Sequence, residues 1–299
     1  MGVRVRVPAK INLALKVGAR RSDGFHPLAT VYHAVSLYDE VWAEWAEPDI
    51  FSVSVTGEGA GVVPLDDTNL AVRAARLLAR TYGRDSLGVS LSITKAIPVA
   101  GGLAGGSSNG AAALLACAAL WDIDPGQATL RRLAAELGSD VPFALLGGTA
   151  LGSGRGEEIV PALAQGTYHW VLAFGDGGLS TPAVYCRFDQ LNERPPVPAV
   201  PPGLIYALRS GDPAKVGAAL SNDLQPAALD LRPRLRQTLE AGLELGALGA
   251  VVSGSGPTCA FLVSGETAAV HLSSGLSAEG VCRAVRRAVG PVAGARVLG

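Results

Sequence analysis

A glycine-rich run at residues 95–109 constrains this chain more than any other part of its sequence. Residues 87–94 alternate apolar and polar side chains as a strand does, and residues 111–120 are alanine-rich and favour a helix. The run therefore predicts a strand-to-helix turn whose backbone N–H groups surround a phosphate. We expect Ser107 or Ser108 to cap the helix. A plain turn is equally compatible with this run in a chain of 38 glycines.

The glycine run differs from three common nucleotide-binding motifs. No Gly-Lys-Ser/Thr follows it, so it is not a Walker-type phosphate loop. It does not follow the first strand of a dinucleotide-binding βαβ unit, and the signatures of protein kinases are absent from the sequence. A phosphate bound here would therefore be bound by another fold.

Composition limits the class of protein and the kind of partner. With 48% hydrophobic and 17% charged residues, the chain is typical of a globular protein. A formal net charge of −1 argues against a general nucleic-acid surface or a surface for anionic membranes. Arg283, Arg286 and Arg287 form a local basic cluster, which we expect on the solvated face of a C-terminal helix. The expected partner is a small molecule, with no nucleic acid and no membrane.

Cysteine spacing and the N-terminal pattern indicate a cytoplasmic protein. The four cysteines, at positions 117, 186, 259 and 282, form no CxxC pair and are expected to be reduced core thiols. Residues 1–7 alternate like a strand and do not resemble a signal peptide, and no stretch of 18 apolar residues occurs. The sequence identifies no set of metal ligands.

The order of the predicted elements indicates two α+β domains, residues 1–160 and 161–299, with a cleft between them. In the first, beside the elements around the glycine run, strands are expected at 3–7, 32–37, 40–46 and 51–56 and helices at 67–78 and 129–137. In the second, strands are expected at 170–174, 249–253, 259–263 and 293–298 and helices at 213–220, 233–243 and 278–289.

Three further segments carry polar residues in unusual places. Lys10 and Asn12 interrupt an apolar strand at i and i+2 and so share one face, although a strand end reaching solvent gives the same pattern. Asp140 lies in a tight turn at 138–142, which also suits the end of a helix. The segment 254–258 is a second candidate for anion binding, and a plain hairpin turn explains it nearly as well.

Together, in this order and at these spacings, the four segments resemble the GHMP small-molecule kinase superfamily, which includes galactokinase, homoserine kinase and mevalonate kinase. Within it, the chain is most similar to members of the non-mevalonate isoprenoid route that phosphorylate the 2-hydroxyl of a cytidine diphosphate-linked methylerythritol. The motifs that carry the resemblance are Pro-Ala-Lys-Ile-Asn-Leu from residue 8, Arg-Ser-Asp-Gly-Phe-His-Pro-Leu from 21, Asp-Thr-Asn-Leu-Ala-Val-Arg-Ala from 67, the glycine run, Gly-Ser-Asp-Val-Pro-Phe from 138 and Gly-Ser-Gly-Pro-Thr from 254. The resemblance spans the whole chain. It implies an N-terminal domain like domain 2 of ribosomal protein S5, a ferredoxin-like C-terminal domain and an active site between them.

The resemblance also implies transfer of phosphate from ATP, with Mg²⁺, to an alcohol. Asp140 would act as general base or electrostatic guide for the attacking hydroxyl, and Lys10 would keep that carboxylate charged and stabilise the transferring group. Asn12 would hydrogen-bond the methylerythritol end. The implied ATP-binding set is Asn69, Lys95, Pro98, Val99, Ala100, Gly101, Gly102, Leu103, Ala104, Gly105, Gly106, Ser107 and Ser108.

At the cytidine end, the resemblance implies two aromatic residues around the base. Phe25 would stack on the cytosine, His26 would hydrogen-bond its edge, and Tyr185 would close the sandwich from the second domain. Thr181 begins the segment that carries Tyr185 and belongs to the same substrate-binding set. Two departures from the family pattern stand out. Phe25 replaces a common tyrosine, and Ala104 replaces a possible glycine, which we expect to require a φ below zero there.

Two other functions are compatible with the sequence. One is a GHMP kinase for another small alcohol of the homoserine or mevalonate type, for which Phe25, His26 and Tyr185 would have no purpose. The other is a catalytically silent nucleotide-binding homologue, which would have no need to retain Lys10 and Asp140 together with the glycine run. The sequence suits either a monomer or a homodimer.

Overall fold

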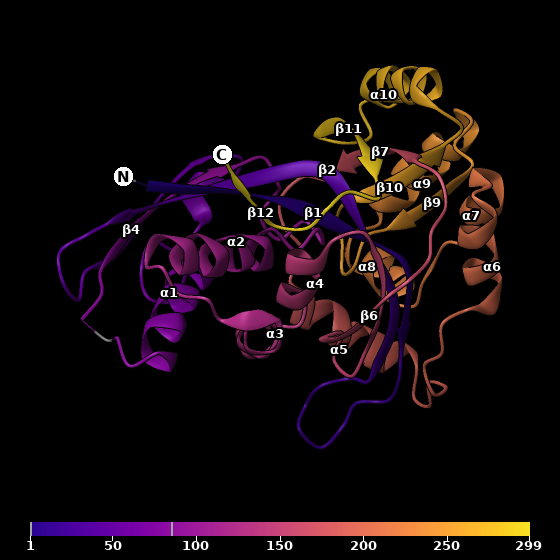
Figure 1. Cartoon of the computed structure of the whole chain (residues 1–299). Helices are drawn as coiled ribbons and strands as arrows, with labels where there is room; N and C mark the ends of the chain where they lie inside the picture. Colours follow the sequence, from indigo (N-terminus) through magenta and orange to yellow (C-terminus); the bar gives the residue numbers. More distant parts are fainter. Residues whose placement is uncertain (1, 85) are drawn as a thin grey trace.

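The structure is a computed structural model, which describes residues 2–84 and 86–299. Two α+β units lie beside each other, each a sheet covered by helices (Figure 1). The first unit contains β1 (Gly2–Val17), β2 (Leu28–Trp45), β3 (Phe51–Gly57), η1 (Ala60–Val62), α1 (Leu70–Thr81), β4 (Val89–Lys95), α2 (Gly105–Leu120), α3 (Gly126–Leu137), α4 (Val141–Leu146), β5 (Thr149–Ser153) and β6 (Glu158–Pro161). The expected two-domain α+β fold is confirmed.

The sheet of the first unit is built around two long antiparallel strands. Its main path runs β12-β1-β2-β4-β3, in which β12 (Arg296–Leu298) comes from the end of the chain. Strands β5, β6 and β8 (Ser221–Asn222) join at its side. Strand β2 is continuous where the sequence predicted two strands, 32–37 and 40–46, because β1 pairs with it along nearly its whole length. The register shifts after Pro8 and after Asn12, and such irregularities change the direction in which nearby side chains point.

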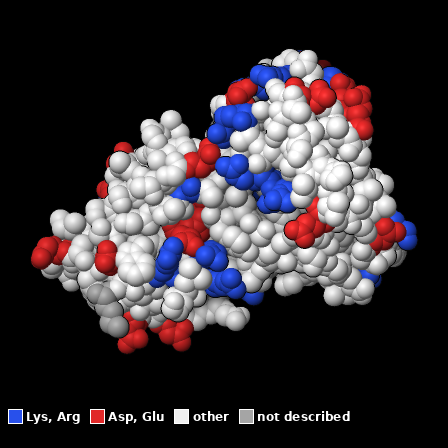
Figure 2. Space-filling model, turned by 90° about the horizontal axis from the view of Figure 1, so that it is seen from above, with Lys and Arg blue, Asp and Glu red and all other residues white. Residues whose placement is uncertain are grey.

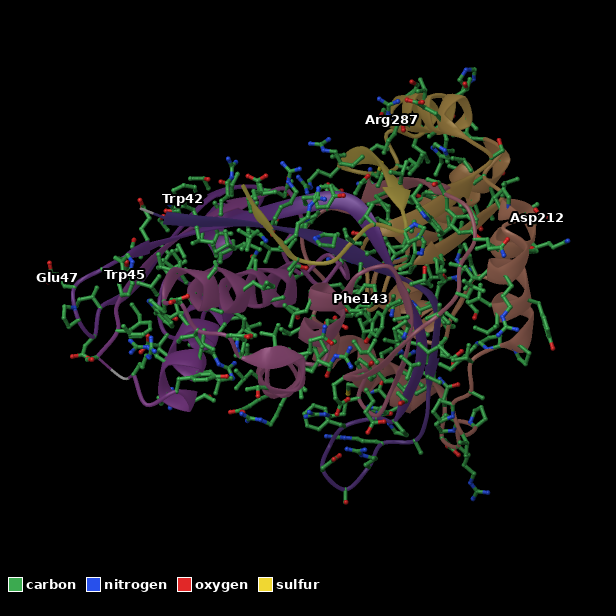
Figure 3. All side chains as sticks on the ribbon, viewed as in Figure 1. Trp42, Trp45, Glu47, Phe143, Asp212 and Arg287 are labelled. Atoms are coloured by element: carbon green, nitrogen blue, oxygen red, sulfur yellow. The ribbon has the colours of Figure 1, made fainter. Side chains whose placement is uncertain are left out.

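Helix α2 forms the centre of the core of the first unit. Its sequence is apolar on every side, so the helix is stable only when covered all round. The sheet covers one side of it, and α1, α3 and α4 cover the other (Figure 1). Figure 3 places Trp42 on the side of the sheet away from these helices and Phe143 below the sheet, where that side chain is buried.

The second unit contains β7 (Tyr168–Phe174), α5 (Thr181–Leu191), α6 (Pro202–Ser210), α7 (Pro213–Ala218), β8 (Ser221–Asn222), α8 (Gln225–Leu231), α9 (Arg234–Glu244), β9 (Gly249–Val252), β10 (Cys259–Val263), α10 (Glu266–Glu279), β11 (Ala284–Gly290) and β12 (Arg296–Leu298). Its sheet has the order β11-β7-β10-β9. The predicted helix at 278–289 is wrong. The helix is α10, and the residues after it form β11, because they complete the sheet by pairing with β7.

The basic cluster of the second unit therefore lies on an edge strand and its approach, not on a helix. Arg286 and Arg287 are exposed on β11, and Figure 3 shows Arg287 on the outer side of the unit. Arg283 pairs with Glu58 of the first unit at 2.7 Å. Positive and negative side chains are interspersed over the face drawn in Figure 2.

The two units share a core, and the second unit contributes two strands to the sheet of the first. The middle of β1 and β2 packs on β7, β10 and α6 through a cluster that includes Ile11, Val31 and Trp170. Strand β12 returns to pair with β1, and β8 pairs with β1 from the other end. We propose the division 1–160 and 161–299 with these two strands crossing back to the first sheet. Because this core contains side chains of both units, it holds the two units in a fixed arrangement where they meet.

Candidate active site

A cavity of about 620 Å³ opens between the two units. Its walls come from β1 and the loop after it, the glycine loop and the turn before α4 on one side, and from α5 and the β9–β10 turn on the other. Of the residues expected at the site, those that border it are Lys10, Asn12, Phe25, His26, Pro98, Ala100, Gly101, Gly102, Ala104, Gly105, Gly106, Ser107, Asp140, Thr181 and Tyr185. Segments far apart in the sequence thus meet at one cavity.

The glycine run forms the loop between β4 and α2. Helix α2 begins at Gly105 with Ala104 as its N-cap residue, so the expected cap at Ser107 or Ser108 is wrong. The expected negative φ of Ala104 is also wrong, because φ is 60° there and 50° at Ala100. A left-handed backbone at a residue with a Cβ costs roughly 1–3 kcal/mol. The packing around the loop has to offset that cost, and it leaves the free N–H groups of the first turn of α2 at the cavity.

The second unit supplies part of that packing. Ser253 donates a hydrogen bond from its hydroxyl to the carbonyl oxygen of Gly102 at 3.0 Å. On the other side of the loop, the backbone N–H of Lys10 donates to the carbonyl of Leu103 at 3.2 Å. The segment 254–258 is the hairpin turn between β9 and β10, as one of its two interpretations predicted. The shape of the loop therefore depends on both units.

Gly102→Ala is expected to destabilise the protein by roughly 1–3 kcal/mol. The φ of Gly102 is +77°, and a Cβ there would overlap the carbonyl oxygen of Ser253, which is backbone that a rotamer change cannot move. Urea unfolding measures the loss. Gly203→Ala in α6, where a Cβ meets open space, is the matched control and is expected to leave stability unchanged or slightly higher. Equal stability of the two variants would contradict the close approach.

A buried carboxylate holds the start of the glycine loop. Asp39 of β2 is fully buried and accepts hydrogen bonds from the backbone N–H groups of Ala96 and Ile97 at 2.7 and 2.8 Å. It also accepts from Lys95 Nζ at 2.5 Å and from the Asn109 side-chain amide at 2.8 Å. The Lys95 ammonium is thus bound to protein groups, and it donates to Asn109 as well. The structure gives Lys95 a role in forming the loop.

Lys10 and Asp140 form an ion pair at the wall of the cavity. Lys10 Nζ lies 3.7 Å from Asp140 Oδ2 and donates to Asn12 Oδ1 at 2.7 Å. Asn12 in turn donates to Thr30 Oγ1 at 2.8 Å, so the amide fixes the ammonium in place. Asp140 immediately precedes α4, and its side chain makes no capping bond to that helix. Its carboxylate therefore remains available to the cavity, next to the Lys10 ammonium that Asn12 holds in place.

Tyr32 forms the floor beside this pair. Its ring stacks on Phe143 with centroids 4.9 Å apart, and Lys10 Nζ lies 5.6 Å from its centroid. Burial raises the pKa of the Tyr32 hydroxyl well above its usual value, and the negative charge of Asp140 raises it further. The hydroxyl is thus a neutral hydrogen-bond donor beside Asp140 at any ordinary pH.

Aromatic residues form another part of the cavity wall. His26 is buried, and its ring centroid lies 4.9 Å from that of Tyr185 on α5. Phe25 is half exposed, and the guanidinium of Arg155 lies over its ring at 4.9 Å. Burial raises the pKa of Tyr185, and the charge of Asp140 adds to the rise. A planar ring that enters this part of the cavity can contact the exposed ring of Phe25, which lies against the Arg155 guanidinium.

Five of the expected residues do not border this cavity. Asn69 caps α1 by accepting from the N–H of Ala71 at 2.9 Å. Ser108 donates to the carbonyl of Pro8 at 2.9 Å, and Leu103 is fully buried in the core. Val99 borders a separate, smaller cavity of about 240 Å³. Lys95 binds Asp39, as described above.

The sequence analysis did not identify four of the residues that border the cavity: Arg20, Tyr32, Arg155 and Asp189. Tyr32 is one member of an ordinary alternating strand, and Asp189 is a single acid on α5. Their partners lie far away in the sequence, so no local pattern marks them. For Asp39, the sequence did contain a sign of its structural role, namely an acidic residue within a strand of mostly buried residues.

The cysteines only partly match the expectation of core thiols. Cys117 and Cys259 are buried, and burial raises the pKa of each thiol. Cys186 is exposed and borders the cavity, so the expectation is wrong for it.

Residues 2–84 and 86–299 contain no group of three or more His, Cys, Asp or Glu side chains placed to hold a metal ion. In that same part of the chain, no helix is both long and apolar enough to cross a membrane.

The chain matches two family profiles, "GHMP kinases N terminal domain" at residues 69–148 and "GHMP kinases C terminal" at residues 204–282. A 4-diphosphocytidyl-2-C-methyl-D-erythritol kinase of Mycolicibacterium gilvum is 55% identical over 301 residues, covering 99% of this chain and 92% of the relative. The protein of the same name from Mycobacterium tuberculosis is 53% identical over 298 residues, covering 99% and 93%.

Solved structures agree with these sequence comparisons. A crystal structure of 4-(cytidine 5'-diphospho)-2C-methyl-D-erythritol kinase superposes with a TM-score of 0.76 at 33% identity, covering 95% of this chain and 98% of that one. Homoserine kinase from Cytophaga hutchinsonii has a TM-score of 0.77 at 20% identity, with 99% and 97% covered, which shows a shared fold alone. The sequence identity of 53–55% over nearly the full length decides between these two kinds of kinase. The chain belongs to the 4-diphosphocytidyl-2-C-methyl-D-erythritol kinases of the GHMP superfamily.

Proposed function

We propose that the chain transfers the γ-phosphate of ATP to the 2-hydroxyl of 4-diphosphocytidyl-2-C-methyl-D-erythritol, giving the 2-phosphate and ADP in the non-mevalonate isoprenoid route. One observation carries the proposal: Lys10 and Asp140 form an ion pair at 3.7 Å in a cavity that the glycine loop and a group of aromatic residues also line. Membership of the family makes the chain a small-molecule kinase that uses ATP.

In this reaction the hydroxyl oxygen attacks the γ-phosphorus, and the bond from that phosphorus to the bridging oxygen of ADP breaks. Asp140 accepts the hydroxyl proton, either as attack begins or after it. Lys10 supplies positive charge to the transferring group, and Asn12 keeps the ammonium in place. The free N–H groups at the start of α2 bind the phosphates. Such a reaction needs positioning and charge neutralisation more than covalent help.

Mg²⁺ fits this site as a companion of ATP. Mg²⁺ is usually held by one or two carboxylates, water and substrate phosphates, and it rarely has an all-protein cage. Asp140 and the hydroxyl of Ser107 border the cavity near the loop and would be its protein contacts. When bound, the ion neutralises phosphate charge during transfer. This donor set agrees with the absence, within the described part of the chain, of a cluster of three metal-binding side chains.

In the aromatic part of the cavity, Phe25 and Tyr185 stack on the two faces of the cytosine, and His26 hydrogen-bonds its edge. Stacking of this kind is worth about 1–3 kcal/mol per base. The guanidinium of Arg155 lies over the Phe25 ring, and Phe25 lacks the hydroxyl of the tyrosine common in the family. All of these groups belong to one chain, so the reaction proceeds in a monomer or a homodimer alike, and we place it in the cytoplasm.

Purified protein with Mg-ATP is expected to release ADP on addition of the cytidyl substrate and to respond at least 100-fold less, as kcat/KM, to homoserine or mevalonate. The reason is that these alcohols have no base for the aromatic part of the cavity. A coupled ADP assay measures both. Turnover of homoserine or mevalonate at a comparable kcat/KM would identify a different GHMP kinase. ATP binding without turnover of any alcohol would identify a silent homologue.

A further inference from the structure

His26 is held by a carboxylate from the other unit of the molecule. Its Nε2 lies 2.7 Å from Oδ1 of Asp189, and 163 positions separate the two residues in sequence. Asp189 lies on α5 one turn after Tyr185, and both border the cavity. The Asp189 side chain is 32% exposed, whereas that of His26 is 6% exposed. The carboxylate therefore approaches an almost buried imidazole from the wall of the cavity.

Packing fixes the plane of this imidazole as well. The ring of Tyr185 is tilted by 34° to it at 4.9 Å, and the ring of Phe188 meets it edge-on at 6.1 Å. Both of these aromatic residues come from α5, as Asp189 does. The helix thus supplies two walls and one acceptor, and the imidazole has little freedom to rotate.

The acceptor determines which nitrogen of His26 carries the hydrogen. A charged carboxylate can only accept a hydrogen bond, so Nε2 must donate to Asp189. In a neutral imidazole the other nitrogen, Nδ1, then has a free lone pair and can only accept. Within residues 2–84 and 86–299, no group donates to Nδ1 of His26. Nδ1 is not among the buried atoms that lack a partner in this part of the chain, so it is accessible and can accept from a ligand in the cavity that His26 borders.

An acceptor at this point distinguishes the two pyrimidine bases. Cytosine carries an amino group, a donor, where uracil carries a carbonyl oxygen, an acceptor. An acceptor that faces the amine forms a hydrogen bond with cytosine, and it faces another acceptor when the base is uracil. A site that leaves a buried polar group unpaired rejects the wrong ligand strongly.

We propose that Asp189 is a positioning residue that holds His26 with its hydrogen on Nε2, so that Nδ1 accepts from the cytosine amine and the site rejects uridine-linked substrates. This inference rests on the proposed function, since it assumes that a cytidine end enters the aromatic part of the cavity. Asp189 itself does not touch the reacting atoms, and its contribution is to binding and to choice of base. A merely structural hydrogen bond between the two residues would affect cytidine and uridine substrates equally.

The first test compares Asp189→Ala with wild type on cytidine- and uridine-diphosphate-linked methylerythritol, each with Mg-ATP. KM for the cytidine substrate is expected to rise about tenfold, the loss of roughly one good hydrogen bond, with kcat within about twofold. The ratio of kcat/KM for cytidine over uridine is expected to fall by the same factor. Asp189→Glu should restore part of that ratio. Gln190→Ala, on the next residue of α5 and outside the cavity, is the control and should leave the ratio unchanged.

The second test observes the tautomer without any turnover. The four histidines allow the ¹⁵N signals of His26 to be assigned by comparison with His26→Gln. Wild-type protein is expected to show hydrogen on Nε2 and a bare Nδ1, and Asp189→Ala should show a mixture of tautomers. A wild-type hydrogen on Nδ1, or a cytidine-to-uridine ratio that Asp189→Ala leaves unchanged, would overturn the inference. Failure of the proposed function would appear separately, as absent turnover of the cytidine substrate by wild type.

Discussion

Asp140→Asn is expected to lower kcat by about 100- to 10,000-fold while the Kd for ATP stays within about twofold of the wild-type value. The substitution keeps the size of the side chain and removes the group that accepts the hydroxyl proton. Stability should change little, because Asp140 makes no cap bond to α4 and its side chain is 28% exposed. Single-turnover ADP release and equilibrium binding of ATP measure the two quantities separately. A kcat near that of wild type would show that Asp140 is not the base.

Lys10 provides a way to test whether the pair acts as one unit. If Lys10 serves through its charge beside Asp140, the double variant Lys10→Met with Asp140→Asn should be about as slow as the slower single variant. Multiplied losses would mean that each residue acts alone. Glu136→Gln, an exposed carboxylate on α3 outside the cavity, controls for the loss of one negative charge and should keep full activity.

The sequence predicted the parts of the site that depend on local pattern. A strand, a glycine-rich turn and an alanine-rich helix follow from alternation and propensity, and β4 and α2 lie there. Lys10 and Asn12 share a face because strand side chains alternate. That these residues meet Asp140 at one cavity came from the resemblance of several motifs together, since each motif alone also suited a plain turn.

Other features could not be predicted because tertiary packing determines them. The left-handed backbone at Ala104 contradicts the preference of alanine and exists only between β1 on one side and the β9–β10 turn on the other. Residues 284–290 have apolar pairs four residues apart, which suits a helix as well as a strand. Their pairing with β7 determined the outcome. Asp39 and Asp189 each have partners more than 50 positions away.

The strongest effect on stability is expected at Asp39, whose carboxylate binds the first residues of the glycine loop although it does not border the cavity. Asp39→Ala should lower the free energy of unfolding by about 3–5 kcal/mol, because it leaves the Lys95 ammonium buried without its counter-charge. The backbone N–H groups of Ala96 and Ile97 lose their acceptor at the same time. Urea unfolding followed by circular dichroism measures the change.

The physical cause of this loss can be separated from simple loss of packing. If the unpaired ammonium is responsible, adding Lys95→Met to Asp39→Ala should recover part of the stability, because the uncompensated charge is gone. A double variant less stable than Asp39→Ala would contradict this explanation. The loop N–H groups remain without their acceptor in the double variant, so its affinity for ATP should stay below that of wild type even where stability recovers. Such a split between stability and ATP binding would show that Asp39 shapes the phosphate loop as well as balancing a charge.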